Sequence, residues 1–501
     1  MNYVSTRDKS LRMTAAQAIV RGLAPDGGLM TPEAFPHLPH GALEQLKDMS
    51  YQQRAVYVMQ SFLQDFSSAE LSAFAAAAYG NGKFSHPDVA PVRPVDGNTW
   101  CLELWHGPTC AFKDMALQML PHLLTASLTK TAEDKTVCIL VATSGDTGKA
   151  AMEGFADVPQ TKILVFYPKD GVSAIQELQM VTQEGGNVGV CSVVGNFDDA
   201  QTGVKKLFSD EKLREQLARR GYFLSSANSI NWGRVLPQIV YYISAYCDLL
   251  RDEKIQPDQA VNVCVPTGNF GNILAAYYAK DMGVPINKLI CASNSNNVLT
   301  DFIRTGTYDR NRTFHNTISP SMDILVSSNL ERLLYEKTEH NSEKINEWMD
   351  ALQEKGTYSI GRDIQDAVVS DFFGAWIDEI ETQETISDVF NNYGYVLDPH
   401  SAVAYKALQK YRLMTSDETY GIVLSTASPF KFSDVVLRAL YPDDYEGKVL
   451  TAFEAMDELS QKARIDIPQG LKELRGLPER ESDIVAPGEM EKEVKKILAI
   501  D

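Results

Sequence analysis

The 501-residue chain lacks the features that would place it in a membrane or in an oxidising compartment. No apolar run approaches the about 20 residues that cross a bilayer, and the first nine residues lack the basic-then-apolar layout of a signal peptide. The seven cysteines are scattered, odd in number and never spaced as Cys-x-x-Cys. Most lie in apolar runs, where a reduced cysteine packs as a small core residue. We therefore expect a cytoplasmic protein without a membrane span.

A metal site is not indicated either. His37 and His40 have a spacing that a metal could use, but Pro36 and Pro39 break the backbone there. No cysteine or acidic cluster lies nearby in the sequence, as a zinc site would need. We expect a loop and no metal.

Positive charge is scarce. Lysine and arginine total 47 against 66 aspartates and glutamates, so the formal net charge is −19. An acidic surface repels nucleic-acid backbones and anionic lipids, which argues against partners of either kind. Any small anionic ligand must be captured by local donors, because the overall field opposes it.

The chain has the composition of a globular protein, with 44% hydrophobic and 23% charged residues. The first ninety-odd residues have a helical pattern, and prolines and a glycine between 87 and 97 mark a boundary. After it, short apolar runs alternate with helical patterns, which predicts an α/β fold with a parallel sheet covered by helices on both faces. The expected strands are 99–104, 137–142, 162–167, 188–194, 261–265 and 421–425. The expected helices are 113–129, 147–156, 172–183, 199–219, 272–282, 329–337, 342–355 and 362–380, with amphipathic helices in the last sixty residues.

Three polar or glycine-rich loops stand where an expected strand ends and a helix begins, which is where open α/β sheets bind ligands. The first is 106–114, with the sequence His-Gly-Pro-Thr-Cys-Ala-Phe-Lys-Asp. Its Lys113 stands at the mouth of a helix that is apolar nearly all round and therefore buried. Burial lowers the pKa of an amine and frees it to form a Schiff base. The alternatives are that Lys113 reaches water or pairs with Asp114.

The second loop is 143–149, with the sequence Thr-Ser-Gly-Asp-Thr-Gly-Lys. Hydroxyls and N–H groups at a helix N-terminus form a socket for a carboxylate or a phosphate. It is not a Walker A loop, because Thr143 replaces the first glycine and Ala150 replaces the magnesium-binding hydroxyl. Asp146 could instead only cap the helix.

The third loop is 266–272, with the sequence Pro-Thr-Gly-Asn-Phe-Gly-Asn. Its two glycines allow close approach of the backbone, and successive N–H groups can hold a phosphate without any lysine. The spacing does not match the dinucleotide fingerprint.

Two further segments fit the same pattern. The stretch 225–234 combines hydroxyls, amides and Arg234 before an apolar helix, and the stretch 426–431 offers hydroxyls at another strand end. A capped helix with a surface arginine is the simpler interpretation of the first. Together, however, a reactive amine, a neutral phosphate cradle and a second anion socket match the needs of pyridoxal phosphate, which requires a lysine, a cradle and a partner for its ring nitrogen.

At this point the chain resembles the threonine synthase family. The resemblance rests on 111–114 (Ala-Phe-Lys-Asp), 143–148 (Thr-Ser-Gly-Asp-Thr-Gly) and 268–272 (Gly-Asn-Phe-Gly-Asn). The segments 3–7 (Tyr-Val-Ser-Thr-Arg), 27–29 (Gly-Gly-Leu) and 398–402 (Asp-Pro-His-Ser-Ala) also resemble the longer branch of that family. No single motif would suffice, but their order along about 440 residues is specific.

The resemblance implies the tryptophan-synthase-like pyridoxal-phosphate fold: two open, mostly parallel sheets flanked by helices, with a helical N-terminal lead-in. Its expected divisions are a mainly helical unit at 1–95, a smaller α/β unit at 96–225 and a larger α/β unit at 226–501. The implied activity is that of a carbon–oxygen lyase acting on phosphates. It would convert O-phospho-L-homoserine and water to L-threonine and phosphate, in a monomer or homodimer.

The resemblance also implies roles for individual residues. Lys113 would be the catalytic lysine that holds pyridoxal 5'-phosphate as an internal aldimine, and Thr426 would hydrogen-bond the ring nitrogen. The cofactor phosphate would lie against Gly268, Asn269, Phe270, Gly271 and Asn272. The substrate would be bound by Ser144, Asp146, Thr147, Ser226, Asn228, Asn231 and Arg234.

The role of Asp146 stays open, because related enzymes often have an asparagine there that contacts the phenolic oxygen of the ring. A carboxylate would repel that oxygen unless a proton is shared, so Asp146 is either protonated or turned away to cap its helix. Two other functions also stay open. A phospholyase would release phosphate, ammonia and a keto acid, and an ATP-binding module would use the glycine loops, although it lacks a Gly-Lys-Ser/Thr element.

Overall fold

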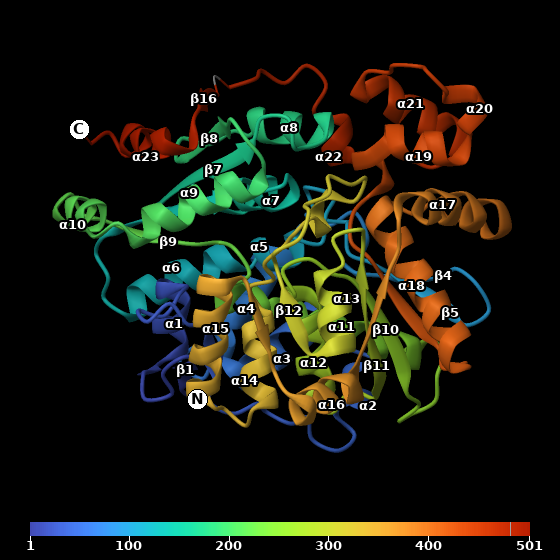
Figure 1. The fold of residues 1–501 in the computed structure, drawn as a ribbon, viewed down its shortest axis with the longest axis horizontal. Coiled ribbons are helices and arrows are strands. Elements are labelled where there is room, and N and C mark those ends of the chain that lie inside the picture. Colours follow the sequence, from blue (N-terminus) through green and yellow to red (C-terminus); the bar gives the residue numbers. More distant parts are fainter. Residues whose placement is uncertain (481, 501) are drawn as a thin grey trace.

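The computed structural model describes residues 1–480 and 482–500, and two sheets form its centre (Figure 1). The larger has six strands in the order β14-β11-β10-β15-β5-β4. All neighbours in it are parallel except β4 and β5. The strands are β4 (Val92–Pro94), β5 (Thr99–Glu103), β10 (Val261–Pro266), β11 (Ile286–Ser293), β14 (Phe372–Trp376) and β15 (Gly421–Ser425).

The smaller sheet has five strands in the order β16-β8-β7-β6-β9, and all of its neighbours are parallel. Its central strands are buried apolar runs, as expected for parallel strands that helices cover on both faces. The α/β fold class is thereby confirmed. The strands are β6 (Thr136–Ala142), β7 (Thr161–Pro168), β8 (Val188–Val193), β9 (Tyr222–Ser225) and β16 (Asp483–Val485).

The chain passes between the sheets more often than the expected boundaries at 96 and 225 allow. Strand β5 falls within the expected smaller unit but pairs with β15 in the six-stranded sheet. Strand β16 falls within the expected larger unit but pairs with β8 in the five-stranded sheet. Both pairings cross the expected boundaries, because a strand joins the sheet whose open edge or gap it fits, which local sequence does not specify.

Helices cover both faces of each sheet. In β10, Val261, Val263 and Val265 pack on one side and Cys264 on the other, following the two-residue period of a strand.

Helices beside the five-stranded sheet are α5 (Asp114–Leu117), α6 (Leu120–Lys130), α7 (Asp146–Phe155), α8 (Ala174–Val181), α9 (Phe197–Ser209), α10 (Glu211–Arg219) and α23 (Met490–Ile497). Those around the six-stranded sheet are α11 (Trp232–Arg251), α12 (Gly271–Asp281), α13 (Val298–Thr305), α14 (Leu330–Lys337), α15 (Ser342–Lys355), α16 (Arg362–Asp371), α17 (Glu379–Tyr393), α18 (Pro399–Thr415), α19 (Ser433–Leu440), α20 (Pro442–Tyr445), α21 (Ala452–Ala463) and α22 (Gln469–Lys472). Short elements complete the chain: the paired strands β12 (Thr307–Asp309) and β13 (Thr357–Ser359), and the 3-10 turns η1 (Pro320–Met322), η2 (Pro429–Phe432) and η3 (Pro487–Glu489).

One expected helix is wrong in part. The stretch 362–380 is helical only to Asp371, and the next five residues form β14, which pairs in parallel with β11. The run Phe372–Trp376 is apolar enough for either structure, and the open edge of β11 decides the outcome. Strand β11 itself was not among the expected strands.

The N-terminal unit is mainly helical, as expected, but it also contains a small sheet. Helices α3 and α4 begin at capping boxes made by Ser50 with Gln53 and by Ser67 with Glu70. Arg332 of α14 donates to the carbonyl oxygens of Met30 and Ile230, at 2.8 and 2.7 Å, so this unit is tied to the loop before α11. Its elements are β1 (Tyr3–Ser5), β2 (Arg12–Met13), β3 (Met30–Pro32), α1 (Ala15–Arg21), α2 (Ala42–Leu46), α3 (Tyr51–Phe62) and α4 (Ser68–Tyr79).

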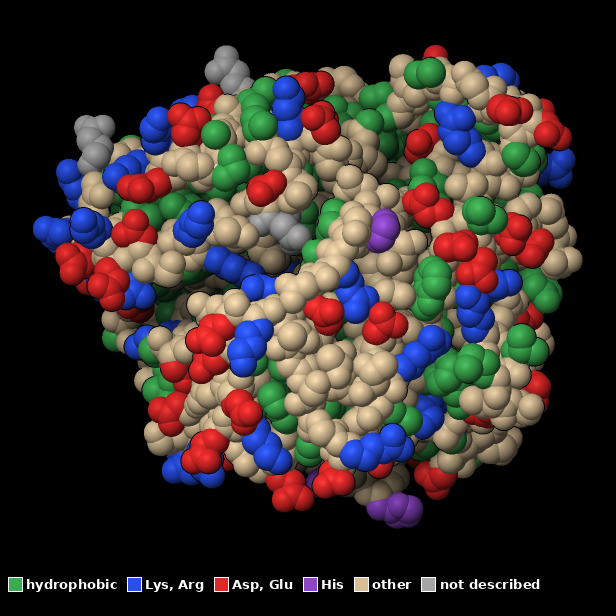
Figure 2. Space-filling view, in the orientation of Figure 1, with side chains coloured by type: hydrophobic (Ala, Val, Ile, Leu, Met, Phe, Trp, Pro, Cys, Tyr) green, Lys and Arg blue, Asp and Glu red, His purple; other side chains and the backbone are tan. Residues whose placement is uncertain are grey.

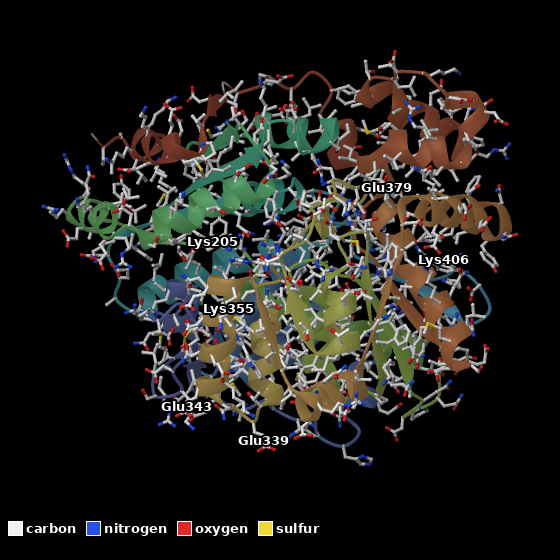
Figure 3. The ribbon with its side chains drawn as sticks, viewed as in Figure 1. Lys205, Glu339, Glu343, Lys355, Glu379 and Lys406 are labelled. Carbon is white, nitrogen blue, oxygen red and sulfur yellow. The ribbon has the colours of Figure 1, made fainter. Side chains whose placement is uncertain are left out.

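The visible surface carries charges of both signs. Figure 2 shows acidic and basic side chains interspersed over one face, with no large area of one sign. Figure 3 labels charged residues that extend from the outer elements of the same face, such as Lys205 of α9 and Lys355 of α15. Within the described residues, no helix has the length and apolar character needed to span a bilayer.

Candidate active site

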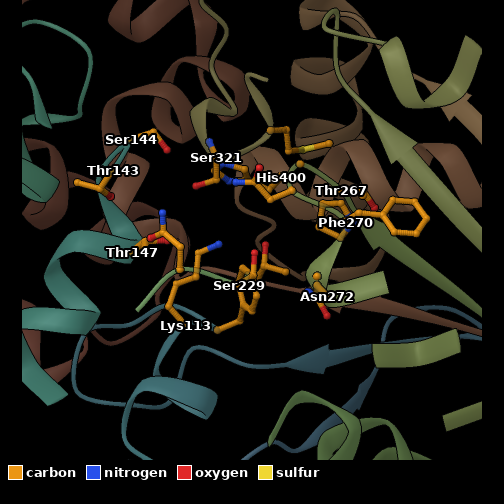
Figure 4. A pocket seen from close by; sticks show the side chains of 18 of the residues that line it. Lys113, Thr143, Ser144, Thr147, Ser229, Thr267, Phe270, Asn272, Ser321 and His400 are labelled. Carbon is orange, nitrogen blue, oxygen red and sulfur yellow. Dashed lines mark hydrogen bonds between the residues drawn. The ribbon is translucent and has the colours of Figure 1, made fainter. Parts of the chain in front are cut away.

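A cavity of about 830 Å³, including its mouth, is lined by loops from both sheets. The loops that follow β5, β6, β10 and β15 all contribute to it, together with the start of α11. Because the carboxyl ends of parallel strands share one edge of a sheet, the loops singled out in the sequence converge there. Figure 4 shows this cavity from close by.

Lys113 points into the cavity, towards the space between Ser144, Ser321 and His400 (Figure 4). Burial lowers its pKa to about 7, and the positive charge of Arg234 acts in the same direction. Asp114 is not its partner, because that carboxylate accepts hydrogen bonds from the backbone N–H and the hydroxyl of Thr109, at 2.9 and 2.7 Å. A substantial fraction of Lys113 is therefore a neutral amine near pH 7, as Schiff-base formation requires.

The loop 268–272 forms a neutral cradle at the start of α12. A side chain at Gly268 would place its Cβ 2.6 Å from the carbonyl oxygen of Ser321, and one at Gly271 would place it 2.9 Å from Cβ of Ser229. The loop carbonyls are used elsewhere, since that of Gly268 accepts from the Ser327 hydroxyl and that of Asn269 from Asn329. The first N–H groups of a helix have no partner within it, so they remain available to an anion.

Asn272 supplies a side-chain donor to the same cradle. Its Oδ1 accepts hydrogen bonds from the hydroxyls of both Tyr241 and Tyr242 on α11, the second at 2.6 Å. These bonds direct Nδ2 of Asn272 away from the tyrosines, and this buried nitrogen has no hydrogen-bond partner among the described residues. A buried donor without a partner, beside a helix N-terminus, is suited to bind an anionic group.

These residues fit pyridoxal phosphate. The cradle offers neutral donors to its phosphate, Lys113 offers an amine to its aldehyde, and Thr426 lines the cavity as a candidate partner for its ring nitrogen. All five residues from Gly268 to Asn272 line the cavity.

Arg234 forms a second site for an anion. It is 4% exposed, and its guanidinium donates to the carbonyl oxygen of Ala227 at 2.6 Å and to the Thr147 hydroxyl at 3.5 Å. No carboxylate within the described part of the chain pairs with it, and burial lowers its pKa to about 10. A buried cation without a counter-ion is costly, so this side chain is suited to an anionic ligand. Ser144, Thr147 and Asn228 line the same cavity.

Three of the residues predicted from the sequence to bind substrate do not line the cavity: Ser226, Asn231 and, described in the next paragraph, Asp146. Asn231 caps α11 through Gly233 N–H and donates to the carbonyl oxygen of Ile19. The Ser226 hydroxyl accepts from the backbone N–H of Asn228 at 3.1 Å. Both side chains therefore shape the loop that carries Asn228 and Arg234.

Asp146 is also outside the lining, and neither open alternative describes it. Burial alone would raise its pKa, but Lys431 lowers the pKa to about 2, so the carboxylate is ionised. The Asp146 carboxylate does not cap α7, because it lies 2.8 Å from Nζ of Lys431. The Thr143 hydroxyl accepts from the backbone N–H of Gly148 in the first turn instead, at 2.9 Å.

The cavity also includes residues that sequence reasoning did not assign. Ser321 comes from η1, which no motif marked. His400 lies in the 398–402 motif without an assigned role. Its Nδ1 lies 2.8 Å from the Asp398 carboxylate, and its Nε2 accepts from the backbone N–H of Ser321 at 3.2 Å. Asp398 and His400 therefore hold Ser321 at the edge of the cavity.

A lysine of lowered pKa, a neutral phosphate cradle and a hydroxyl at a third strand end, on this fold, define the class of pyridoxal-phosphate-dependent enzymes. The family described as pyridoxal-phosphate-dependent enzymes matches residues 90–362. The families described as the threonine synthase N terminus and the threonine synthase C-terminal region match residues 2–79 and 401–497. The threonine synthase of Pseudomonas aeruginosa is 39% identical over 440 residues, which cover 88% of this chain and 90% of that protein.

The chain belongs to the threonine synthase family, and its cofactor is pyridoxal phosphate. The solved structure of pyridoxal-phosphate-bound threonine synthase from Brucella melitensis matches with a TM-score of 0.86 and 36% identity, over 99% of each chain. Human threonine synthase-like 1 is 41% identical over 436 residues. That match covers 85% of this chain and 58% of the human protein, so the chain spans about three fifths of the length of that relative.

Proposed function

We propose that this protein converts O-phospho-L-homoserine and water to L-threonine and phosphate. The observation that carries the proposal is the second anion site: Arg234 lies buried without a counter-ion in the same cavity as Lys113 and the cradle. The cofactor phosphate explains why the cavity has the 268–272 cradle, but it does not explain the second anion site. A substrate that carries its own phosphate accounts for Arg234.

The two ends of the substrate would be held by different loops. Arg234 and Asn228 bind the phosphate, while Ser144 and Thr147, at the N-terminus of α7, bind the carboxylate. Thr426, which lines the cavity, would hydrogen-bond the ring nitrogen of the cofactor. A hydroxyl does not keep that nitrogen protonated as a carboxylate would, which moderates electron withdrawal.

Pyridoxal phosphate, when bound, withdraws electrons from the α carbon of an attached amino acid. Lys113, with a pKa near neutrality, is suited both to accept and to return protons at pH 7. It removes the proton from Cα of the substrate and then one from Cβ. Phosphate leaves from Cγ, water adds at Cβ, and protons return to Cα and Cγ. The released phosphate, still held by Arg234, is placed to help activate that water.

A phospholyase remains the second candidate. It would use the same lysine and cradle but release phosphate, ammonia and 2-oxobutyrate without adding water at Cβ. Similarity to proteins named threonine synthase-like 1, beside those named threonine synthase, keeps this outcome open.

Product analysis tests the proposal. The purified holoenzyme is incubated with O-phospho-L-homoserine, and phosphate, threonine and 2-oxobutyrate are assayed separately. Threonine equal to the phosphate released is the expected result. 2-Oxobutyrate equal to phosphate would establish the phospholyase, and no phosphate release would refute both. The Lys113→Ala variant is the blank for each assay.

A cytoplasmic location and a monomeric or homodimeric state are part of the same proposal. All seven cysteines are buried and free, which suits a reducing compartment. Fractionation and light scattering test these two points.

A further inference from the structure

A buried ion pair between Asp146 and Lys431 lies beside the cavity, and neither residue is part of its lining. Nζ of Lys431 lies 2.8 Å from Oδ1 of Asp146, and the two side chains are 0% and 4% exposed. The lysine also donates to the carbonyl oxygen of Thr109 at 2.9 Å. Oδ1 of Asp146 accepts from Nε2 of Gln176 at 2.8 Å, so both charges are hydrogen-bonded in more than one direction.

The pair joins segments of different origin. Asp146 begins α7, directly after the loop from the five-stranded sheet that carries Ser144. Lys431 lies in η2, directly after the loop from the six-stranded sheet that carries Thr426. Thr109 belongs to the loop that leads to Lys113. One ion pair therefore connects three loops of the cavity.

A buried ion pair gives little net stability, but removing one partner leaves an uncompensated charge. Such a pair is better suited to fixing geometry than to stabilising the fold. We propose that Asp146 and Lys431 form a positioning pair that holds the 143–147 loop against the 426–431 loop and balances the charge around Lys113. The proposal rests on Lys113 as the cofactor-binding amine, and not on which product the enzyme releases.

The charges around Lys113 fix the sign of the change that each substitution should cause in its pKa. The charged groups that act on Lys113 are Arg234 from α11, Asp146 from α7 and Lys431 from η2. Asp146 raises the pKa of Lys113, and the two cations lower it. Removing Lys431 must therefore raise this pKa, removing Asp146 must lower it, and removing both must return it towards its starting value.

The test is competitive acetylation of the apoenzyme, with the Lys113 peptide quantified by mass spectrometry and the exposed Lys355 as internal standard. Below neutral pH the labelling rate follows the neutral fraction of the amine. At pH 5.5 we expect labelling of Lys113 to fall about tenfold in Lys431→Met and to rise about tenfold in Asp146→Asn, as for the loss of one nearby charge. Labelling of Lys113 in the double variant should lie within about threefold of that in the unaltered protein. Lys431→Arg should change this labelling less than Lys431→Met does.

Two results would overturn the proposal: shifts of the same sign in both single variants, or changes below twofold in folded protein. Circular dichroism establishes folding. If Lys431→Met does not fold, Asp146→Asn and the double variant still give the predicted order. Labelling does not depend on turnover, so an incorrect assignment of the product would leave this result unchanged.

Discussion

The two anion sites of the cavity are built on different physical principles. The loop 268–272 holds no formal charge, and presents backbone N–H groups and the Asn272 amide where a Cβ would not fit. The site around Arg234 instead presents one buried guanidinium, which pairs with no carboxylate among the described residues. The first site therefore selects a phosphate by shape and the second by charge.

This difference suits the two ligands. A cofactor phosphate that stays bound needs close contact, and neutral donors impose no cost of buried charge when the site is empty. The proposed phosphorylated substrate would have to bind anew in each turnover, against the overall field of a protein of net charge −19. A formal positive charge inside a low-dielectric cavity supplies that attraction. Lys113 lines the same cavity as both sites.

The largest effect is expected at Lys113, the amine proposed to bind the cofactor between the two phosphates. Lys113→Ala should lower turnover at least about 10³-fold, because the proton-transferring amine is lost. Borohydride reduction should no longer attach the cofactor covalently, whereas both phosphate sites remain. Turnover and peptide mass spectrometry are the measurements, with Lys355→Ala on the surface as control. Covalent label elsewhere, or retained turnover, would remove Lys113 from the site.

Breaking the shape-based site should abolish cofactor binding. In Gly268→Val the added Cβ would approach the Ser321 carbonyl to 2.6 Å, so the loop must shift. We expect affinity for pyridoxal phosphate to fall about 100-fold or more, as for loss of several charge-assisted hydrogen bonds. Gly97→Ala is the matched control, because nothing lies within 4 Å of its Cβ position. Unchanged affinity measured by fluorescence titration would contradict the cradle.

Breaking the charge-based site should affect the substrate alone. Arg234→Gln removes the buried cation, and KM for O-phospho-L-homoserine should rise about 50-fold, corresponding to hydrogen bonds to a charged group. Affinity for pyridoxal phosphate should stay within about twofold. Arg234→Lys, which keeps the charge but loses the planar fork, should lie between the two. Equal effects on cofactor and substrate would mean that the two sites are not separate.

The smallest effect is expected at Tyr242, whose hydroxyl orients Asn272 in the cradle. Tyr242→Phe removes one hydroxyl that orients Asn272, and affinity for pyridoxal phosphate should fall about fivefold, the value of one hydrogen bond. Pyridoxal, which lacks the phosphate, should bind with unchanged affinity. Tyr246→Phe is the control on the same helix, because its hydroxyl donates to Gln259 instead. A loss of equal size for pyridoxal would place the tyrosine's effect outside the phosphate site.

Local motifs predicted the parts of the site that consecutive residues build. A strand end, a glycine loop and a helix start are short-range features, so Lys113, the 268–272 cradle and Thr426 could be located without a structure. Arg234 is the last residue of the 225–234 segment and stands in the first turn of α11, and it too lines the cavity. The alternation of apolar runs also predicted the α/β class, which the structure confirms.

The remaining features depend on which distant segments meet. No local pattern linked Asp146 to Lys431 or Ser321 to His400, and each contact joins loops from separate parts of the chain. The run Phe372–Trp376 could be helix or strand until β11 provided an edge. Sheet membership of β5 and β16 was likewise decided by available partners and not by composition.

Residue types in their order along the chain thus determined the class of fold and the cofactor, and they singled out Lys113 as the proposed amine, because helix starts, strand ends and backbone cradles form from neighbouring residues. Tertiary structure alone decided which charges are compensated. Asp146 is ionised and paired, whereas Arg234 is buried without a counter-ion, and both conditions arise from packing that excludes water and selects partners across the two sheets.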